Sequence, residues 1–329
     1  MHLIHLLNGK AFSANDGETL LDAGLRAGVT LPYSCRTGRC STCRCRVSAG
    51  TTSALHAETG LTPAEHAEGW VLSCVRSATS EVKLDIEDLG VLPPARTLAC
   101  RIHAIERLAP DVLRIALRLP PTVEFDYRPG QYVDMIGPGG IRRSYSIANV
   151  ASADKRIELH VRQVEGGMMS AHWFDDARQN DLLRLHGPLG TFFLRGIAGL
   201  DLVFLATGTG IAPVKAILES LPALSADQAP RTTSVFWGGR HESDLYWKPD
   251  MPAGDVRFVR VLSRADASWQ GARGHVQDVF AATAPDLART AVYACGSDAM
   301  IHAAHRRLVE AGLPERRFSS DAFVCSAAV

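Results

Sequence analysis

The sequence predicts a multidomain protein in which an α+β unit is followed by a mostly-strand unit and then by an α/β unit. Closely spaced cysteines mark the first part of the chain, and short alternating strands with Gly and Pro turns fill the middle. Apolar strands alternate with helical stretches in the last part. A length of 329 residues is enough for two or three domains. We place the boundaries at residues 1–95, 96–197 and 198–329.

The composition excludes several classes of protein. Hydrophobic residues make up 46% and charged residues 21%, which is ordinary for a soluble globular protein. The formal net charge is zero, so no global charge argues for binding nucleic acid or a membrane surface. No run approaches the length of a membrane span. Eight cysteines without a secretion signal indicate a reducing compartment, taken as the cytoplasm, and metal ligation instead of disulfides.

The first unit is expected to adopt a β-grasp ferredoxin fold. Its predicted elements are a hairpin of residues 3–7 and 11–13, a helix within 16–28 capped by Thr19, a strand at 45–47, a helix starting near Pro63 and a strand at 82–87. The paired prolines within residues 92–95 predict the linker that follows.

Four cysteines predict an iron–sulfur cluster in this unit. Cys35, Cys40, Cys43 and Cys74 have the spacing C-x4-C-x2-C…C, which is the plant-type [2Fe-2S] pattern. Two ligands on one tight loop can share an iron, while the third and a distant fourth hold the other. Zinc would prefer C-x2-C pairs on both sides, and the absence of His from the loop excludes a Rieske centre.

The middle unit is expected to form a small antiparallel barrel. Its predicted elements are strands at 100–105, 112–119, 131–135 and 157–164, with a helix at 168–177. The strand segment Arg143-Ser144-Tyr145-Ser146 could bind a phosphate, a flat ring and a ring nitrogen; the alternative is a solvent-facing Arg beside a core Tyr. Residues 166–170 form a glycine-rich helix start, which is either an anion site or an ordinary capped helix.

The last unit is expected to be a doubly wound parallel α/β domain. Its predicted elements are strands at 202–206, 233–237, 257–262 and 291–294, with helices ending at Leu221 and spanning 275–282 and 298–311. Gly208-x-Gly210-x-x-Pro213 lies where the first strand meets a helix, as in a pyrophosphate-binding turn. Taken alone, a strand-to-helix turn without a ligand would look similar.

Together these motifs resemble the ferredoxin–NAD(P)H reductase family, in its form with an N-terminal plant-type ferredoxin domain. The resemblance covers nearly the whole chain and implies FAD and NADH as cofactors beside the cluster. It implies that Arg143 contacts the FAD pyrophosphate, that Tyr145 stacks on the isoalloxazine and that Ser146 approaches its N5. The implied cofactor-binding residues are Arg143, Ser144, Tyr145, Ser146, His160, Val161, Gly167, Met168, Met169, Ser170, Thr207, Gly208, Gly210, Pro213, Trp237, Gly238, Cys295 and Gly296.

The resemblance also implies catalytic roles for Ser146, Cys295 and Phe323. The Cys295 sulfur would lie near the nicotinamide, and without the family context it would be interpreted as a buried core thiol. Phe323 would cover the flavin face until nicotinamide displaces it. Asp321 is expected to be a surface turn residue, with a polar group near the flavin as the alternative.

Different segments of the chain resemble different branches of this family. Residues 142–149, 157–162, 187–193 and 318–324 are similar to CDP-6-deoxy-delta-3,4-glucoseen reductases, and residues 33–47 to reductases of aromatic-ring dioxygenases. The first branch implies a pyridoxamine-dependent CDP-4-keto-6-deoxyhexose 3-dehydratase as the electron acceptor, and the second an oxygenase component. In both, NADH gives hydride to FAD, and single electrons then reach the partner through the cluster. A redox-sensing module without turnover is a third hypothesis.

Charged residues give two further hypotheses. Glu242 or Asp244 could accept a hydrogen bond from a ribose 2′-OH and favour NADH, whereas Arg240 could pair with a 2′-phosphate. Arg36, Arg39, Arg44 and Arg46 are either a docking face for an acidic partner or a solvated rim. Cys45 is expected to be a packed thiol.

Overall fold

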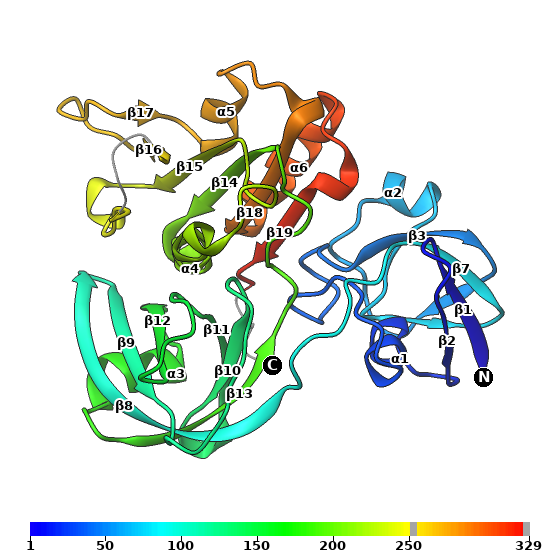
Figure 1. Ribbon diagram of the computed structural model, residues 1–329, viewed down its shortest axis with the longest axis horizontal. Helices are drawn as coiled ribbons and strands as arrows, with labels where there is room; N and C mark the ends of the chain where they lie inside the picture. The colour runs from blue at the N-terminus through cyan, green and yellow to red at the C-terminus, as the bar shows by residue number, and fades with distance from the viewer. Residues whose placement is uncertain (251–254, 325–329) are drawn as a thin grey trace. The chain divides into compact units, whose positions relative to one another are not determined.

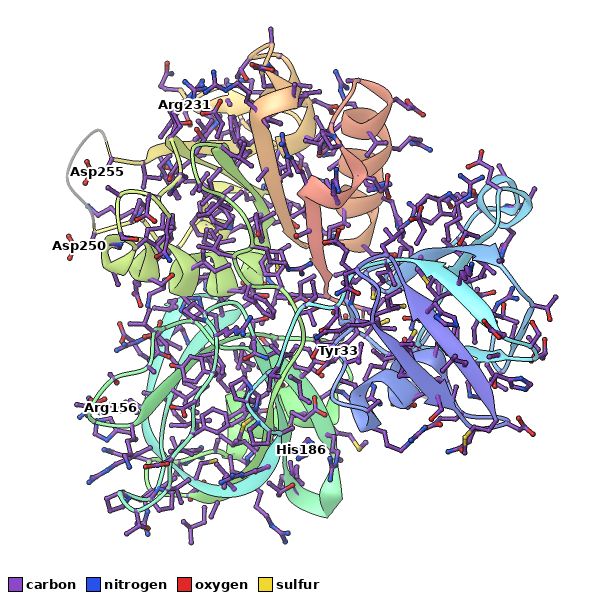
Figure 2. The ribbon with its side chains drawn as sticks, turned by 45° about the vertical axis from the view of Figure 1, so that its right-hand side comes forward. Tyr33, Arg156, His186, Arg231, Asp250 and Asp255 are labelled. Atoms are coloured by element: carbon purple, nitrogen blue, oxygen red, sulfur yellow. The ribbon has the colours of Figure 1, made fainter. Side chains whose placement is uncertain are left out.

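A computed structural model describes residues 1–250 and 255–324 of the chain (Figure 1). Asp250 and Asp255, labelled in Figure 2, are the described residues on either side of the first gap. The chain divides into two compact units. The first comprises residues 1–93 with the described chain end from Asp321, and the second comprises Pro94–Ser320.

The first unit is a five-stranded sheet with one helix packed on it. Its elements are β1 (His2–Leu6), β2 (Ala11–Ala14), α1 (Leu20–Arg26), β3 (Arg44–Ala49), β4 (Thr52–Ala54), α2 (Pro63–Ala67), β5 (Trp70–Leu72), β6 (Arg76–Ala78) and β7 (Val82–Asp85). The sheet order is β2-β1-β7-β3-β5, and β4 pairs separately with β6. The antiparallel β1–β2 hairpin and the parallel β1–β7 pair confirm the expected β-grasp pattern.

Local chemistry explains why these helices begin where they do. The Thr19 side chain accepts a hydrogen bond from Asp22 N at 3.0 Å, so it caps α1 as predicted. Leu20 and Leu21 are fully buried and hold α1 on the sheet. Thr62 and Glu65 form a capping box at α2, which has no buried residue and is therefore held mainly by its ends.

The barrel of the second unit contains strands β8 (Arg96–Ala109), β9 (Val112–Arg118), β10 (Tyr132–Ile136), β11 (Arg142–Ser146), β12 (Arg156–Arg162) and β13 (Leu182–Leu189), with a 3-10 turn η1 (Pro138–Gly140). The sheet order is β11-β10-β13-β8-β9-β12, and a bridge between Ile147 and Leu159 joins its two ends. The predicted helix at 168–177 is divided into α3 (Met168–Ala171) and the π-helical turn η2 (His172–Asp176).

The α/β lobe of the second unit contains strands β14 (Asp201–Thr207), β15 (Thr232–Gly239), β16 (Arg257–Leu262), β17 (Ala272–Arg273), β18 (Thr290–Gly296) and β19 (Phe318–Ala322, of which the first three residues belong to this unit). Its helices are α4 (Ile211–Ser220), α5 (Val276–Ala281) and α6 (Asp298–Glu310), and its 3-10 turns are η3 (Gly208–Gly210), η4 (Leu221–Ala223), η5 (Glu242–Asp244), η6 (Leu287–Arg289) and η7 (Glu315–Arg317). The order is β17-β16-β15-β14-β18-β19, with β14 parallel to both neighbours.

Strand β14 is buried on both faces, as its continuous apolar run predicts. Its residues Leu202 and Phe204 share a core with α4. On β15, Phe236 packs against Phe280 of α5 at 5.4 Å between ring centroids. Figure 1 shows α4 apart from α5 and α6 across this sheet, which confirms a doubly wound lobe. None of the described helices is long and apolar enough to cross a membrane.

Candidate cofactor sites

The four predicted cluster cysteines form two pairs in the first unit. The Sγ atoms of Cys43 and Cys74 are 3.2 Å apart. Cys35 and Cys40 are also hydrogen-bonded to each other. This bond lowers the pKa of Cys35 to about 5 and raises the pKa of Cys40. Among the described residues, no group of three His, Cys, Asp or Glu side chains could hold a single ion. Two thiols per metal fit a two-iron cluster with four cysteine ligands.

The loop that carries three of these cysteines is tightly wound. Arg36 and Ser41 both have a φ of 58°, a left-handed conformation that non-glycine residues rarely adopt. At Gly38, φ is 75°, and a Cβ atom would lie 2.4 Å from the carbonyl oxygen of Ala57. Glycine is therefore required at this position by the neighbouring loop as well as by the turn.

Cys45 is a packed thiol, as expected. It is 1% exposed on β3, and burial raises its pKa to about 12. Cys43 and Cys74 are nearly as buried, but each has the other as a sulfur neighbour. Burial alone therefore does not distinguish the proposed ligands from Cys45; the pairing does.

The arginines around the cluster loop have partners within the first unit. Arg36 pairs with Asp22, and Arg46 donates to Glu68 O at 2.8 Å. Arg44 pairs with Glu65 at 3.1 Å, stacks 4.1 Å from the ring centre of Trp70, and has a side chain only 15% exposed. A docking face built on four solvated charges is thus too simple an interpretation, because two of the charges are neutralised by nearby carboxylates.

In the barrel, the segment predicted to bind flavin is strand β11. Arg143 donates to its neighbour's carbonyl, Arg142 O, and no carboxylate of the described residues lies within ion-pair distance of it. Ser144 Oγ donates to Asp134 Oδ1 at 2.6 Å on the adjacent β10. Tyr145 OH accepts from Trp173 Nε1 at 3.1 Å, and burial raises the pKa of Tyr145 to about 12. Ser146 is buried at the strand end.

The structure brings the predicted helix start close to β11. Trp173 of η2 contacts Tyr145, and a Cβ atom at Gly137, in the turn between β10 and β11, would lie 2.5 Å from Met169 Sδ. Ser170 Oγ accepts from Val164 N at 2.8 Å, which ties the start of α3 to the preceding loop. The segment of α3 and η2 therefore packs beside β11, with Gly167 at the N-cap of α3 and Met168 exposed next to it.

Three residues predicted to bind flavin have side chains that pack within the protein. Met169 and Val161 both belong to the barrel core and are 1% exposed. The His160 ring is also buried, with Nε2 2.9 Å from Glu158 Oε1 and Nδ1 3.1 Å from Tyr246 OH. Any contact of these three residues with a flavin would therefore be made by their backbone.

Alternate residues of β12 form a row that the sequence did not predict. Glu158, His160 and Arg162 point away from the barrel core and contact the α/β lobe of the same unit. Glu158 lies 3.3 Å from Lys215 of α4, His160 contacts Tyr246, and Arg162 Nη2 donates to Asp244 at 2.6 Å. On the other side of the same guanidinium, Arg162 Nε donates to Asp111 Oδ2 at 2.8 Å.

Burial and neighbouring charges shift the pKa values of Glu158 and His160 in opposite directions. Burial raises the pKa of Glu158, but the hydrogen bond with His160 and the charge of Lys215 outweigh it, and the pKa falls to about 2. Burial lowers the pKa of His160 despite the neighbouring carboxylate. A neutral His160 therefore donates from Nε2 to Glu158, and its Nδ1 accepts from Tyr246 OH.

In the α/β lobe, the predicted dinucleotide residues meet at the carboxyl ends of β14, β15 and β18. The parallel register pairs Ala206 with Cys295 and Thr207 with Gly238. Ser297 N donates to Thr207 Oγ1 at 2.9 Å, and Trp237 Nε1 donates to Gly208 O at 2.9 Å. This edge, followed by α4, is where parallel sheets bind nucleotides.

The glycines of this motif are fixed by packing as well as by any ligand. Gly210 has an ordinary φ of −59°, yet a Cβ atom there would lie 2.3 Å from Cys295 O. Gly208 has a φ of 54°, and its Cβ would lie 2.8 Å from Arg162 Nη1. Pro213 lies in the first turn of α4, where no hydrogen bond is lost. The turn is therefore pre-shaped before a coenzyme binds.

Several remaining predictions have mixed outcomes. Trp237 and Cys295 are fully buried in the lobe core, and Gly296 has a φ of 118° at the strand end. Phe323 is 37% exposed at the described chain end. The expectation that Asp321 is a surface turn residue is wrong: it is 4% exposed and accepts from Ser34 Oγ at 2.5 Å, within the first unit.

The residues proposed to select the coenzyme are not equally available. Asp244 Oδ2 accepts from Arg240 N at 2.7 Å and His241 N at 3.1 Å, while Oδ1 accepts from Arg162. Glu242 is 67% exposed and lies 3.6 Å from Arg260. Glu242 is thus the better candidate acceptor for a ribose hydroxyl.

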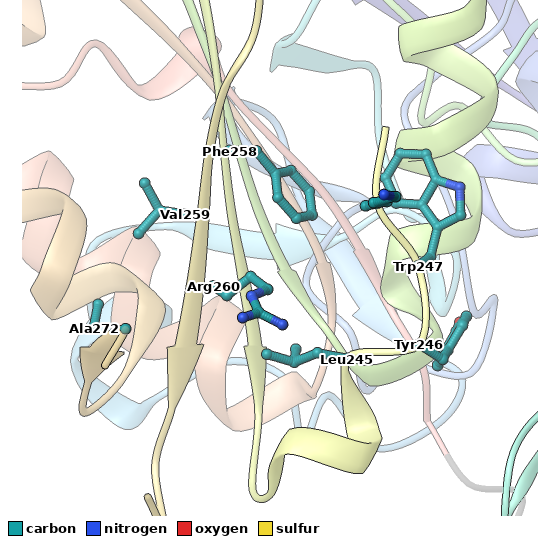
Figure 3. Close-up of a pocket in the computed structure, with 9 residues that line it drawn as sticks. Leu245, Tyr246, Trp247, Phe258, Val259, Arg260 and Ala272 are labelled. Atoms are coloured by element: carbon teal, nitrogen blue, oxygen red, sulfur yellow. The ribbon is translucent and has the colours of Figure 1, made fainter. Parts of the chain in front are cut away.

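A cavity of about 630 Å³ lies elsewhere in the lobe (Figure 3). Phe258 and Arg260 project from β16 toward the segment that carries Tyr246 and Trp247, whereas Val259 points away. None of the described residues lining it is among those predicted to bind a cofactor. Trp247 and Phe258 make an edge-to-face contact at 5.9 Å, so we interpret its aromatic wall as packing of the lobe.

Comparison with known proteins follows the same three-part order. Residues 6–79 match the 2Fe-2S iron-sulfur cluster binding domain, residues 99–194 the oxidoreductase FAD-binding domain and residues 204–306 the oxidoreductase NAD-binding domain. The chain is 38% identical over 327 residues to the CDP-6-deoxy-L-threo-D-glycero-4-hexulose-3-dehydrase reductase of Yersinia pestis, with 97% of each chain covered.

Other relatives serve different systems. The chain is 29% identical to reductase component 1 of the terephthalate 1,2-dioxygenase of Comamonas sp., with 99% of this chain and 98% of the relative covered. An Amycolatopsis cytochrome P450 reductase has a similar solved structure, with a TM-score of 0.73 and 30% identity, covering 98% of this chain and 99% of that one. The chain therefore belongs to the ferredoxin–NAD(P)H reductase family, in the form that carries a 2Fe-2S domain ahead of its FAD- and NAD-binding domains.

Proposed function

We propose that this oxidoreductase passes electrons from NADH to a pyridoxamine-dependent CDP-4-keto-6-deoxyhexose 3-dehydratase. The observation that carries the partner assignment is the 38% identity, over 97% of both chains, to a relative named as the reductase of a CDP-6-deoxy-L-threo-D-glycero-4-hexulose-3-dehydrase. The protein would act in the cytoplasm, since thiolate ligands persist in a reducing compartment. The chemistry supplied by the bound cofactors is hydride acceptance by the flavin and one-electron transfer by the cluster.

The chain's own residues would hold and orient these groups. Cys35 and Cys40 would ligate one iron, and Cys43 and Cys74 the other, in line with their pairing. Arg143 would neutralise the FAD pyrophosphate, since no described carboxylate already pairs with it. The hydrogen bond from Trp173 would hold the Tyr145 ring in place to stack on the flavin, and the buried Ser146 hydroxyl would bond to the flavin N5.

The nicotinamide dinucleotide would lie at the edge formed by Thr207, Gly208 and Gly238. Support comes from the convergence of these backbone positions at three strand ends and from the position of η3 and α4 directly after β14. Cys295 and Phe323 would act on the nicotinamide and the flavin face, as the family resemblance implies. Glu242 would accept from the ribose 2′-OH and repel a 2′-phosphate, which favours NADH.

A reconstituted assay tests the partner. The purified protein would be combined with a pyridoxamine 5′-phosphate-dependent 3-dehydratase, its CDP-4-keto-6-deoxyhexose substrate and NADH. We expect NADH oxidation coupled to formation of the 3-deoxy product. Coupled turnover with a Rieske or P450 oxygenase, and none with the dehydratase, would instead establish the oxygenase role that the dioxygenase and P450 reductase relatives favour. Absence of turnover with every acceptor would favour the sensing module.

The coenzyme choice is tested separately by steady-state ferricyanide reduction. We expect a higher kcat/KM with NADH than with NADPH, and a smaller ratio in Glu242→Gln, because the substitution removes the charge that repels a 2′-phosphate. Saturation at a lower concentration of NADPH than of NADH would contradict this choice.

A further inference from the structure

Glu58 is a buried carboxylate in an otherwise exposed loop, and its partners lie on both sides of Cys74. Its side chain is 3% exposed, whereas His56, Ala57 and Thr59 are exposed. Glu58 Oε1 accepts from Leu72 N at 2.7 Å, and Oε2 accepts from Arg76 Nε at 2.8 Å and Nη2 at 2.6 Å. One carboxylate therefore spans the segment whose centre is the fourth proposed ligand.

The same loop is fastened to the segment that carries the other three cysteines. We call residues 55–60 the Glu58 strap. Gly60 N donates to Gly38 O at 3.0 Å, and Ser41 Oγ donates to Gly60 O. Leu55 N donates to Val75 O at 2.8 Å at the other end. The strap thus joins the cysteine loop on one side to the Cys74 segment on the other.

Arg76 makes the geometry of this join specific. Its Nη1 donates to Thr52 O and Thr52 Oγ1, both at 3.2 Å, while its other nitrogens hold Glu58. The Arg76 side chain is 19% exposed, and His66 Nδ1 of α2 lies 3.8 Å from Glu58 Oε2. A forked, largely buried ion pair fixes both partners in one arrangement, and loss of one partner leaves the other charge uncompensated.

We infer that Glu58 is a positioning residue for the iron–sulfur cluster. Through Arg76 and the Leu72 amide, it holds Cys74 at a fixed distance from the loop of Cys35, Cys40 and Cys43. This inference rests on the proposed ligand set, and it adds a residue that the cysteine pattern does not contain. The inference concerns how tightly, and in what geometry, the four thiols hold the cluster.

The test compares Glu58→Gln with Glu81→Gln in the full-length holoprotein. Glu81 belongs to the same unit, is 65% exposed and pairs with His5 at 2.9 Å, so it controls for loss of one carboxylate. Cluster loss to an iron chelator is followed by absorbance, and the dithionite-reduced cluster is examined by EPR. We expect Glu58→Gln to lose the cluster on the order of tenfold faster, because substitution of a residue that orients a metal ligand weakens metal affinity by at least that factor, and we expect altered g-values. Glu81→Gln should match the wild type.

Two further variants make every outcome decisive. Arg76→Lys keeps the positive charge but not the two parallel hydrogen bonds to Glu58, so we expect a rate of cluster loss between those of the wild type and Glu58→Gln. If Glu58→Gln does not fold, Arg76→Lys takes its place in the comparison. A lower unfolding temperature with unchanged EPR and chelator kinetics would reduce Glu58 to a structural role and overturn the inference. If Cys74→Ala alters the cluster while Glu58→Gln does not, the inference alone fails. If Cys74→Ala leaves the cluster spectrum unchanged, the proposed ligand set fails with it.

Discussion

At the scale of single residues, a cysteine's neighbour indicates more about its role than its burial does. Cys45 and Cys43 are 1% and 2% exposed and only two positions apart. Cys43 has the Cys74 sulfur at 3.2 Å, whereas burial alone is the main cause of the raised pKa of Cys45. The sulfur pairing of Cys43 is what a metal ligand requires, whereas Cys45 is packed in the core.

This difference predicts opposite results for two matched substitutions. Cys40→Ala should lose most of its iron, because three thiolates do not complete a two-iron site. Cys45→Ala should keep about two irons per chain, at a small cost in stability for the cavity. Iron analysis and visible absorbance of the purified proteins measure both. Equal iron loss in the two variants would contradict the ligand assignment.

Glu158 gives a residue-scale prediction about acid stability. Its pKa is about 2 in the folded protein against an ordinary 4.5, so its stabilising effect is complete above pH 4.5 and is lost as the pH falls toward 2. Over that window, Glu158→Gln should remove on the order of 2 kcal/mol of the pH-dependent change in unfolding free energy.

Flavin release on heating, followed by fluorescence at each pH, reports this change in the second unit. Glu106→Gln is the control, since Glu106 pairs with the same Arg114 but has a side chain 54% exposed. A curve for Glu158→Gln that parallels the wild type down to pH 2 would show that the buried cluster around His160 does not contribute to acid stability.

At the scale of elements, the shape of the turn predicted to bind the dinucleotide depends on close contact between η3 and the end of β18. A Cβ atom on Gly210 would lie 2.3 Å from Cys295 O, although its φ suits any residue. Gly210→Ala should therefore push η3 away from β18, cost about 1–3 kcal/mol and raise the KM for NADH more than it lowers kcat.

Gly199→Ala is the matched control for this substitution. Gly199 has a φ of 67° with open space around it, so alanine there adds only backbone strain of about 1–2 kcal/mol. It should leave the KM for NADH unchanged. Equal effects of the two substitutions on KM would mean that the close contact at Gly210 does not shape the coenzyme site.

Elements with local causes were predictable from sequence, and contacts between distant strands were not. Thr19 capping α1, the β1–β2 hairpin and the apolar β14 strand each follow from a few neighbouring residues. In the sequence, Glu158, His160 and Arg162 are recognisable only as the polar residues of an alternating strand. Their contacts with Lys215, Tyr246 and Asp244 depend on how the barrel packs on the α/β lobe.

The candidate sites divide in the same way. Spacing was enough to predict the four cysteines as ligands, because metal ligation restricts residue type and separation together. Spacing did not identify the strap, since Glu58 is one acid among several between Cys43 and Cys74 and its burial depends on Leu72 and Arg76. Family patterns named His160 and Met169, but those patterns do not distinguish a side-chain contact from a backbone contact.

At the scale of the whole molecule, partner docking should depend on salt less steeply than the arginine count suggests. Asp22 and Glu65 neutralise Arg36 and Arg44, which leaves a weaker positive field at the cluster loop. We expect electron transfer to the partner to slow moderately with added salt, while ferricyanide reduction stays constant. Arg39→Gln should weaken this salt dependence, and Lys83→Gln, on β7, should not. Identical salt dependence with both acceptors would remove the electrostatic docking hypothesis.

The central claim is that one chain carries electrons from NADH through its flavin to its cluster. Anaerobic titration of the holoprotein with NADH, followed by absorbance and by EPR, tests it most directly. The account predicts flavin bleaching together with the signal of a reduced [2Fe-2S] cluster, and in Cys40→Ala flavin bleaching alone. Flavin bleaching in the wild type with no cluster signal at any NADH concentration would contradict the account.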